Sequence, residues 1–177
     1  MARIAMAVAL CLAALASAGD ERRRDSNDRD ASAARLEQIK RLAGEWVLAD
    51  AAKDEADEVV AVYKITAGRS AVIETLFPGS DREMITVFYQ HHDDLMLTHF
   101  CSLGNQPRMK AERGGDPKTL TFRFTDGTNL RTDKDAYMRV LKLTFVDDDR
   151  LKAEWTLFDK GSEQSVKTFD LKRKPAK

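Results

Sequence analysis

From residue 45 to residue 173, apolar and polar side chains alternate with a period of two. Turn-forming pairs such as Pro78-Gly79 and Asp126-Gly127 break this alternation roughly every 12 residues, which is typical of short strands joined by tight turns. A long antiparallel meander has to hide its edge strands, and closure into an up-and-down barrel does so most economically. The pattern therefore predicts an all-β barrel of about ten strands, at residues 45–50, 58–66, 70–77, 82–90, 94–101, 107–113, 118–125, 137–147, 150–158 and 163–173.

A helical period precedes these strands. Leu36, Ile39 and Leu42 fall on one stripe of a helix of about three turns. Ser32 is suited to be its N-cap, and Gly44 is suited to end it. We expect this helix to cap the barrel.

The first 18 residues have the pattern of a secretory signal peptide. A positive start, Met1-Ala2-Arg3, is followed by the apolar run 4–16 and by the small residues Ala16-Ser17-Ala18, which a signal peptidase accepts. The run is too short to span a bilayer, which takes about 20 residues, so we expect no stable membrane insertion. The protein is predicted to be exported, either to a periplasm or to the outside of the cell.

Three segments follow from these patterns: the signal peptide 1–18, a leader 19–31, and a barrel domain 32–177. The leader is charged and shows no periodicity, so we predict that it is disordered. The chain carries 29 basic and 29 acidic residues with interspersed signs. This balance gives no electrostatic reason to expect nucleic acid as a partner.

Two cysteines are present, and cleavage of the signal peptide would remove Cys11. Cys101 then has no partner for an intramolecular disulfide. His99 and Cys101 alone cannot complete a zinc site, and the sequence contains no P-loop, dinucleotide fingerprint or HExxH motif. We therefore predict no metal site and no cofactor.

The entry into the first strand resembles a known family. Gly44-Glu45-Trp46, directly after a short helix, is similar to the G-x-W motif of the calycin barrels, which include lipocalins, fatty-acid-binding proteins and nitrobindin-like proteins. In such barrels the tryptophan plugs the closed end, and a basic residue from the last strand often packs over it. The resemblance implies that role for Arg173, with Lys172 and Lys174 as alternatives.

A second resemblance covers residues 63–110. The strings ETLFPG, EMITVFY, LTHFC and GNQPRM are similar to uncharacterised secreted bacterial proteins of calycin-like type. Nitrobindin-like proteins hold a haem on a histidine near the chain's end, whereas no histidine follows His99 here. The resemblance thus implies the fold and export, and it implies neither haem nor a defined activity.

Residues 82–101 predict a hairpin with His92-Asp93 as its two-residue turn. This register pairs Thr86 with His99 and Phe88 with Leu97, and it makes both faces of the hairpin largely apolar. A barrel strand normally shows one polar face to water. Either the outer face is covered, by the helix or by a second subunit in a homodimer, or the polar minority lines a cavity.

The candidate ligand-binding residues cluster around this hairpin. His99 and Cys101 share a face, and they form either a pocket pair or an ordinary buried imidazole beside a small thiol. Asn105, Gln106 and Arg108 follow in a turn, where Arg108 is suited to hold a carboxylate or a phosphate.

Two further candidates lie on other strands. Glu74 interrupts an otherwise apolar strand and is the possible internal partner of Arg108. If the loop around Pro78-Gly79 has four residues, Glu74 faces away from His99, and a bulge would reverse this. Arg139 shares the register of Leu141 and Leu143, so it either faces inward or lies at the rim.

These observations predict an exported β-barrel that binds a small, partly apolar molecule in or at the mouth of the barrel. The alternatives are an enzyme that uses the region of His99, Cys101 and Arg108, and an interaction module with a filled core. The presence or absence of a cavity separates the last alternative from the first.

Export can be checked directly. Mature protein recovered outside the cytoplasm should begin at Gly19, because the peptidase pattern ends at Ala18. N-terminal sequencing of that material would show this, and a sequence that begins at Met1 would contradict it.

Overall fold

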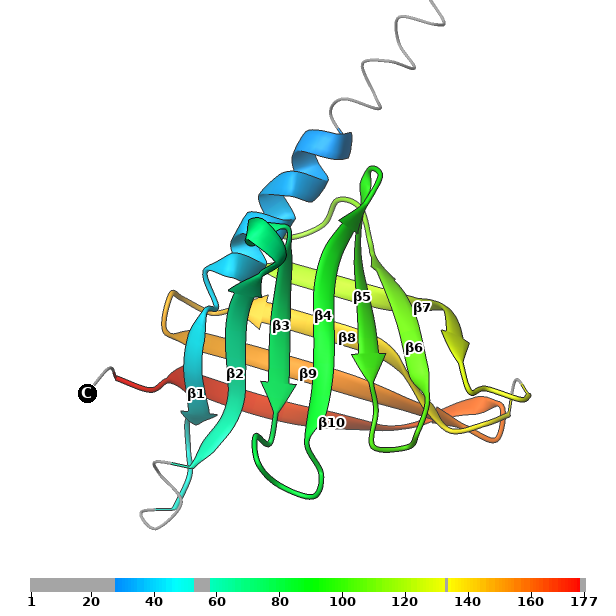
Figure 1. Cartoon of the computed structure of the whole chain (residues 1–177). Helices are drawn as coiled ribbons and strands as arrows, with labels where there is room; N and C mark the ends of the chain where they lie inside the picture. Colours follow the sequence, from blue (N-terminus) through cyan, green and yellow to red (C-terminus); the bar gives the residue numbers. More distant parts are fainter. Residues whose placement is uncertain (1–27, 53–57, 133, 176–177) are drawn as a thin grey trace, which may run out of the picture.

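The computed structural model describes residues 28–52, 58–132 and 134–175, in which ten antiparallel strands close into a barrel (Figure 1). Each strand pairs with the next one along the chain, and the last pairs with the first. The strands are β1 (Gly44–Leu48), β2 (Val59–Thr66), β3 (Ala71–Leu76), β4 (Met84–His91), β5 (Asp94–Phe100), β6 (Gln106–Ala111), β7 (Thr119–Thr128), β8 (Tyr137–Phe145), β9 (Arg150–Asp159) and β10 (Ser162–Arg173). A short 3-10 turn, η1 (Ala67–Arg69), joins β2 to β3. The predicted up-and-down barrel is confirmed, and the predicted strand ends agree to within a few residues.

The helix that precedes β1 covers residues 28–40 of the described chain. Leu36, Ile39 and Leu42 are buried in the core, as their spacing predicts. The helix already includes residues 28–31, so the predicted N-cap at Ser32 is wrong and the end of the predicted leader is helical. Ion pairs to the barrel hold this first turn, from Arg29 to Asp93 at 3.0 Å and from Asp28 to Arg113. The signal peptide and residues 19–27 lie outside the described residues.

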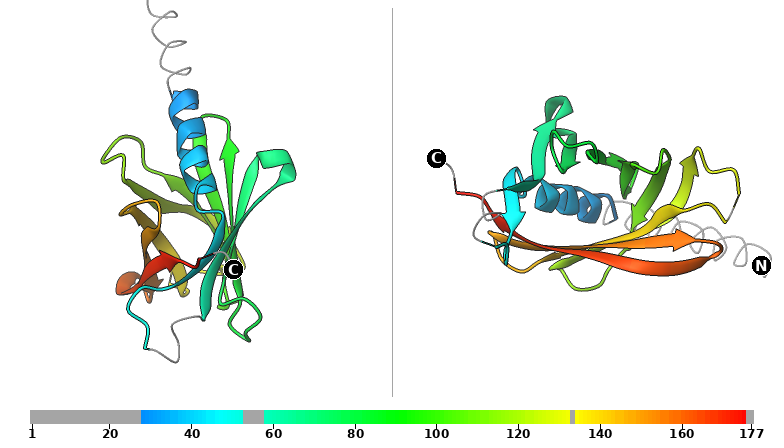
Figure 2. Two further views of the ribbon diagram at one scale, coloured as in Figure 1. Left: turned by 90° about the vertical axis from the view of Figure 1, so that its left-hand side faces the viewer. Right: turned by 90° about the horizontal axis from the view of Figure 1, so that it is seen from below.

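The helix lies over one end of the barrel and closes it. Gln38 Nε2 donates to the carbonyl of Pro117 at 2.9 Å, and Arg35 donates to the carbonyl of Gly114 at 3.0 Å, both in the β6–β7 connection. Seen from below, the helix lies within the outline formed by the strands (Figure 2). The barrel therefore has a closed end at the helix and a second end without such a cover.

Closure along the barrel wall depends on a narrow seam. β1 and β10 share three register pairs, Trp46 with Arg173, Val47 with Lys172 and Leu48 with Leu171. Trp46 is fully buried, and its Nε1–H donates to the carbonyl of Leu42 at 2.8 Å. The Arg173 guanidinium lies 4.6 Å from the centre of the Trp46 ring, so Arg173 is the basic residue that covers the plug.

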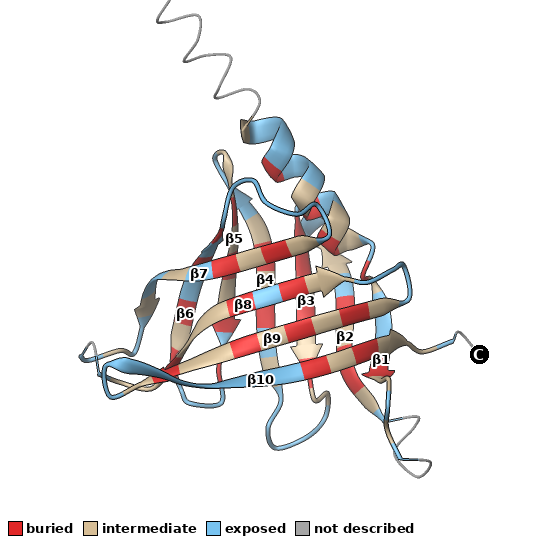
Figure 3. Ribbon diagram, turned by 180° about the vertical axis from the view of Figure 1, so that it is seen from behind, coloured by how far each residue is buried: buried red, intermediate tan, exposed pale blue. Residues whose placement is uncertain are grey.

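The barrel interior is packed with apolar side chains, and buried positions alternate with more exposed ones along most strands (Figure 3). Phe88 and Phe122 meet edge to face in the middle of this core, with ring centres 5.6 Å apart. Such interdigitated packing is the main source of stability in a barrel without disulfides, since Cys101 is free. No helix in the described part of the chain has both the length and the apolar character needed to cross a membrane.

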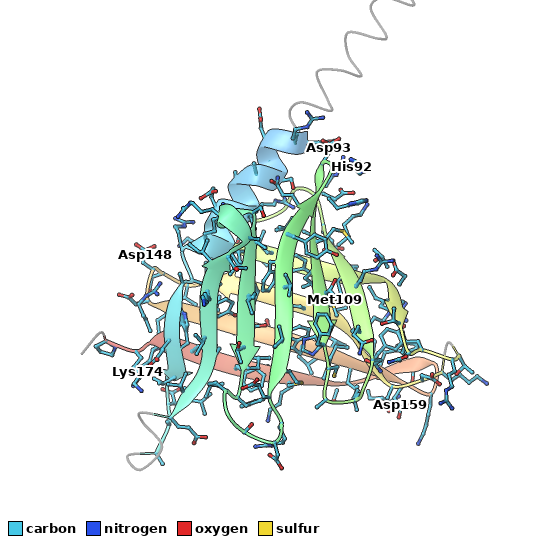
Figure 4. The ribbon with its side chains drawn as sticks, in the orientation of Figure 1. His92, Asp93, Met109, Asp148, Asp159 and Lys174 are labelled. Carbon is cyan, nitrogen blue, oxygen red and sulfur yellow. The ribbon has the colours of Figure 1, made fainter. Side chains whose placement is uncertain are left out.

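The β4–β5 hairpin has the predicted register. His91 pairs with Asp94 around the turn His92-Asp93, which stands at the tip beside the helix (Figure 4). Thr86 and His99 are both buried, so the polar minority of the hairpin lies inside the barrel. On the outer face, Ile85 and Phe100 stay 37% and 48% exposed in the described chain, because the helix covers the barrel end instead.

The seam provides a test of the fold. Arg173 donates to the carbonyls of Ala43, Arg41 and Asp148 at 2.9, 2.9 and 3.0 Å. Arg173→Met should lower the free energy of unfolding by about 2 to 3 kcal/mol, because these carbonyls lose a charged donor and Trp46 loses its cation.

The control for this test is Lys172→Met on the adjacent position of the same strand, which should change stability by less than about 0.5 kcal/mol. Denaturant unfolding of both variants makes the comparison. Equal stability of the two variants would show that charge at the end of β10, and not the Arg173 contacts, is what matters.

Candidate functional site

Four polar side chains form a single row across four neighbouring strands. Tyr63 on β2 is paired in register with Glu74 on β3, Glu74 with Thr86 on β4, and Thr86 with His99 on β5. Register partners on adjacent strands point to the same face of the sheet. All four point into the barrel, and none is more than 2% exposed. We call Tyr63, Glu74, Thr86 and His99 the polar row.

Hydrogen bonds connect the row in two pairs. The Tyr63 hydroxyl donates to Glu74 Oε1 at 2.5 Å, and Thr86 Oγ1 lies 2.9 Å from His99 Nδ1. Glu74 Oε2 is enclosed and forms no hydrogen bond of ordinary geometry within the described chain. A buried carboxyl oxygen without a partner costs free energy, so the row is a polar feature that packing alone does not require.

Burial shifts the pKa values of the three titratable side chains in the row, Glu74, His99 and Tyr63. Removal from water raises the pKa of Glu74, and the nearby hydroxyls of Tyr63 and Thr86 oppose this rise. Burial lowers the pKa of His99 to about 4, so its imidazole is uncharged at neutral pH. The pKa of Tyr63 is raised well above its usual range by burial and by the neighbouring Glu74.

The position of Glu74 corrects one step of the sequence reasoning. A four-residue loop would turn Glu74 away from His99. Instead β3 ends at Leu76, which pairs with Met84, and the loop covers residues 77–83. Phe77, predicted to be the last strand residue, has a left-handed backbone with φ of 52° and leaves the strand. This shifts the pairing by one position and brings Glu74 onto the same face as His99.

A pocket of about 190 Å³ opens at the end of the barrel away from the helix, next to the polar row. His99 and Trp155 form its inner wall, with their rings tilted against each other and their centres 4.5 Å apart. The remaining wall is mainly apolar and comes from β3, β4, β8, β10 and the β3–β4 loop, with the side chains of Leu76, Phe77, Met84, Met138 and Phe169.

Two cations stand at the mouth of this pocket. Lys167 is paired in register with Trp155, and its ammonium group lies 5.8 Å from the ring centre of Phe169. Arg82 lies over the ring of Phe77 at 5.5 Å. Among the described residues, neither cation is in an ion pair with a carboxylate. The mouth thus combines apolar rings with two positive charges that form no ion pair among the residues the structure describes.

The residues of the predicted β5–β6 turn do not join this pocket. Arg108 points outward from β6 and pairs with Asp126 at 2.5 Å, far from any contact with Glu74. Asn105 Nδ2 donates to the carbonyl of Ala136 at 2.8 Å and ties the turn to the start of β8. Gln106 accepts a hydrogen bond from Thr128 on the neighbouring strand. The contacts of these three residues are structural.

Arg139 and Cys101 also have local surroundings of their own. The Arg139 guanidinium packs over the ring of Phe158, 4.4 Å from its centre. The thiol of Cys101 is buried, and burial raises its pKa, which disfavours the thiolate. A Cys–His nucleophile therefore receives no support from the geometry. Of the predicted site residues, His99 lines the pocket. Glu74 is not part of the pocket wall and belongs to the same polar row as His99.

Several residues of the site were not among the sequence candidates. Tyr63 and Thr86 look like ordinary strand residues until the register is known, and Trp155 is simply apolar in sequence. Lys167 could have been recognised from the sequence. It alternates with Phe169 and Leu171, so the three side chains share one face of the strand, and a charge is unexpected on a face that points inward.

Comparison with known proteins does not assign a function to this site. The chain matches no family model, and no curated protein matches it. Within the residues that the structure describes, no group of three or more histidine, cysteine or carboxylate side chains is arranged to hold a metal ion.

The buried His99 predicts a pH dependence of stability. Its pKa is about 4 in the folded protein and 6.5 in the unfolded chain, so only the unfolded chain gains a proton as the pH falls through 6.5. The free energy of unfolding should therefore lose about 3 kcal/mol between neutral pH and pH values below 4. Glu74, whose pKa is raised, acts in the opposite direction, with stability lost as the pH rises.

The measurement compares wild type with His99→Asn, whose amide can still reach Thr86. Urea unfolding at several pH values should give a flatter acid limb for the variant. Parallel curves for the two proteins would show that His99 titrates normally in the folded barrel.

Proposed function

We propose that this protein is an exported calycin-like barrel that binds a small, partly apolar molecule carrying an acidic group. The supporting observation is a mainly apolar pocket at the barrel end away from the helix, with two cations at its mouth, Arg82 and Lys167, that form no ion pair within the described chain. The apolar part of the ligand would enter toward His99 and Trp155, and the acidic group would stay near the cations.

The size and lining of the pocket limit the ligand. About 190 Å³ is below the range of roughly 300–1,000 Å³ that holds drug-sized molecules. It suits a molecule with a short chain or a single ring, in the place of about six water molecules. Met84 and Met138 in the wall are flexible and polarisable, so they can adapt to different apolar shapes.

The charge at the mouth favours an acid over a neutral molecule. Each cation lies near an aromatic ring of the pocket wall, which holds its positive charge at the mouth of the pocket. No acidic side chain lines this pocket. The sequence suggested Arg108 as the cation that anchors the ligand. In this proposal, Arg82 from the β3–β4 loop and Lys167 from β10 take that role.

The alternatives receive less support. A filled-core interaction module has no use for a pocket beside a buried polar row. An enzyme would need a poised nucleophile or base, whereas the Cys101 thiol is held in its protonated form and His99 is a weak base. Export and a homodimer that covers Ile85 and Phe100 belong to the proposal as well, on the N-terminal pattern and on the exposed outer face.

The charge argument can be tested with two probes of equal length, heptanoate and 1-heptanol, in competition with an environment-sensitive hydrophobic dye. Wild type should bind heptanoate about 3- to 10-fold more tightly. The double variant Arg82→Met, Lys167→Met should bind both probes equally, with the affinity for 1-heptanol unchanged.

A matched control removes two cations elsewhere, through Lys64→Met and Lys172→Met, and should retain the preference for the acid. Failure of the wild type to bind either probe would defeat the proposed function. Binding of both probes with equal affinity would defeat the part of it that concerns the acidic group.

A further inference from the structure

We infer that the inner end of the pocket recognises a neutral hydrogen-bond acceptor on the ligand, such as a ketone or ester carbonyl, through the Nε2–H of His99. This inference rests on the proposed function, because it names the chemistry of the end of the ligand that lies farthest from Arg82 and Lys167. It is carried by the way in which the polar row holds the imidazole.

The geometry decides which nitrogen of His99 faces the pocket. Nδ1 lies 2.9 Å from Thr86 Oγ1, so Thr86 occupies it. Nε2 has no hydrogen-bond partner in the described chain. The unpaired polar side-chain atoms that are fully enclosed there are Glu74 Oε2, Asn105 Oδ1, Arg150 Nε and Trp155 Nε1, and Nε2 of His99 is not one of them. His99 lines the pocket and its Nδ1 is paired with Thr86, so Nε2 is the ring nitrogen left for a ligand.

The polar row also decides where the proton of the neutral imidazole sits. The Thr86 hydroxyl has one proton, which it can give either to Glu74 or to His99 Nδ1. Glu74 accepts from the Tyr63 hydroxyl through Oε1, and its second oxygen, Oε2, forms no hydrogen bond with Thr86 or any other described residue, whereas Thr86 Oγ1 lies within hydrogen-bond distance of His99 Nδ1. Thr86 therefore donates to Nδ1, and the imidazole proton lies on Nε2. The pocket then ends in a hydrogen-bond donor.

The same surroundings exclude a charged acceptor at this depth. The inner wall is formed by an uncharged imidazole and an indole, and the two cations are at the mouth. A carboxylate placed against His99 would lose its hydration without gaining a counter-ion, and this costs more than one hydrogen bond returns. A carbonyl oxygen accepts the Nε2–H without that cost. A ligand with one acidic end and one carbonyl fits both ends of the pocket.

A matched pair of probes tests this. Heptanoate and 6-oxoheptanoate share the carboxylate and the chain length, and they differ in a ketone near the far end. Wild type should bind 6-oxoheptanoate about 3- to 10-fold more tightly at neutral pH, which is the gain from one hydrogen bond. His99→Leu should bind both equally, and His99→Gln, which offers an amide N–H in place of Nε2–H, should recover a preference for the ketone.

Two variants of the row, Glu74→Gln and Thr86→Val, test whether the row positions His99. In Glu74→Gln the amide is neutral and can accept from Tyr63 as the carboxyl does, so Thr86 stays directed to His99 and the preference for the ketone should persist. Thr86→Val removes the hydroxyl that orients His99 and should weaken the preference for the ketone.

The outcomes are distinguishable. Wild type that binds both probes with equal affinity overturns the inference and leaves the proposed function standing, and this comparison needs no variant to fold. Binding of neither probe overturns both. A preference for the ketone that survives in His99→Leu overturns the role of His99.

Discussion

The barrel is held closed by a seam of three residue pairs between β1 and β10 and by the Trp46–Arg173 contact that covers it. A seam this short contributes few backbone hydrogen bonds, so side chains complete the closure. Arg173 binds carbonyls at the end of the helix and in the β8–β9 turn, and Trp46 binds the carbonyl of Leu42. These contacts satisfy backbone carbonyls that the end of a helix would otherwise leave unpaired. The helix and these contacts consequently cover this end of the barrel.

The barrel end away from the helix differs from the helix end. The apolar interior continues there, and the Trp46 plug lies at the other end. The polar row crosses β2 to β5 and reaches the pocket at His99, and it contains an enclosed oxygen of Glu74 that has no hydrogen-bond partner in the described chain. Replacing such a buried polar group by an apolar one of similar volume is often neutral or stabilising in proteins. The row lies next to a pocket that His99 lines, and in the proposed function it supports the imidazole and fixes the position of its proton.

The alternation of apolar and polar residues was sufficient to predict ten strands, their order and the barrel, because closure leaves few ways to arrange a meander. It was also sufficient for the β4–β5 hairpin, whose two-residue turn fixes the register. The register across the β3–β4 loop could not be predicted. Whether Phe77 ends the strand or turns out of it depends on its left-handed backbone, and that single residue decides which face Glu74 occupies. The site residues were recognised only where charge or imidazole stood out. Tyr63, Thr86 and Trp155 acquire a role through their register partners, whereas Arg108 is conspicuous in sequence and lies in a surface ion pair.

The central claim is that the buried row presents an uncharged His99, with its proton on Nε2, to the pocket. Nitrogen-15 NMR of the imidazole tests it most directly, because protonated and unprotonated ring nitrogens have widely separated shifts. At neutral pH, Nδ1 of His99 should show the shift of an unprotonated acceptor and Nε2 that of an N–H donor, while the exposed His91 and His92 serve as references in the same spectrum. A positively charged His99, or a proton on Nδ1, would contradict the claim.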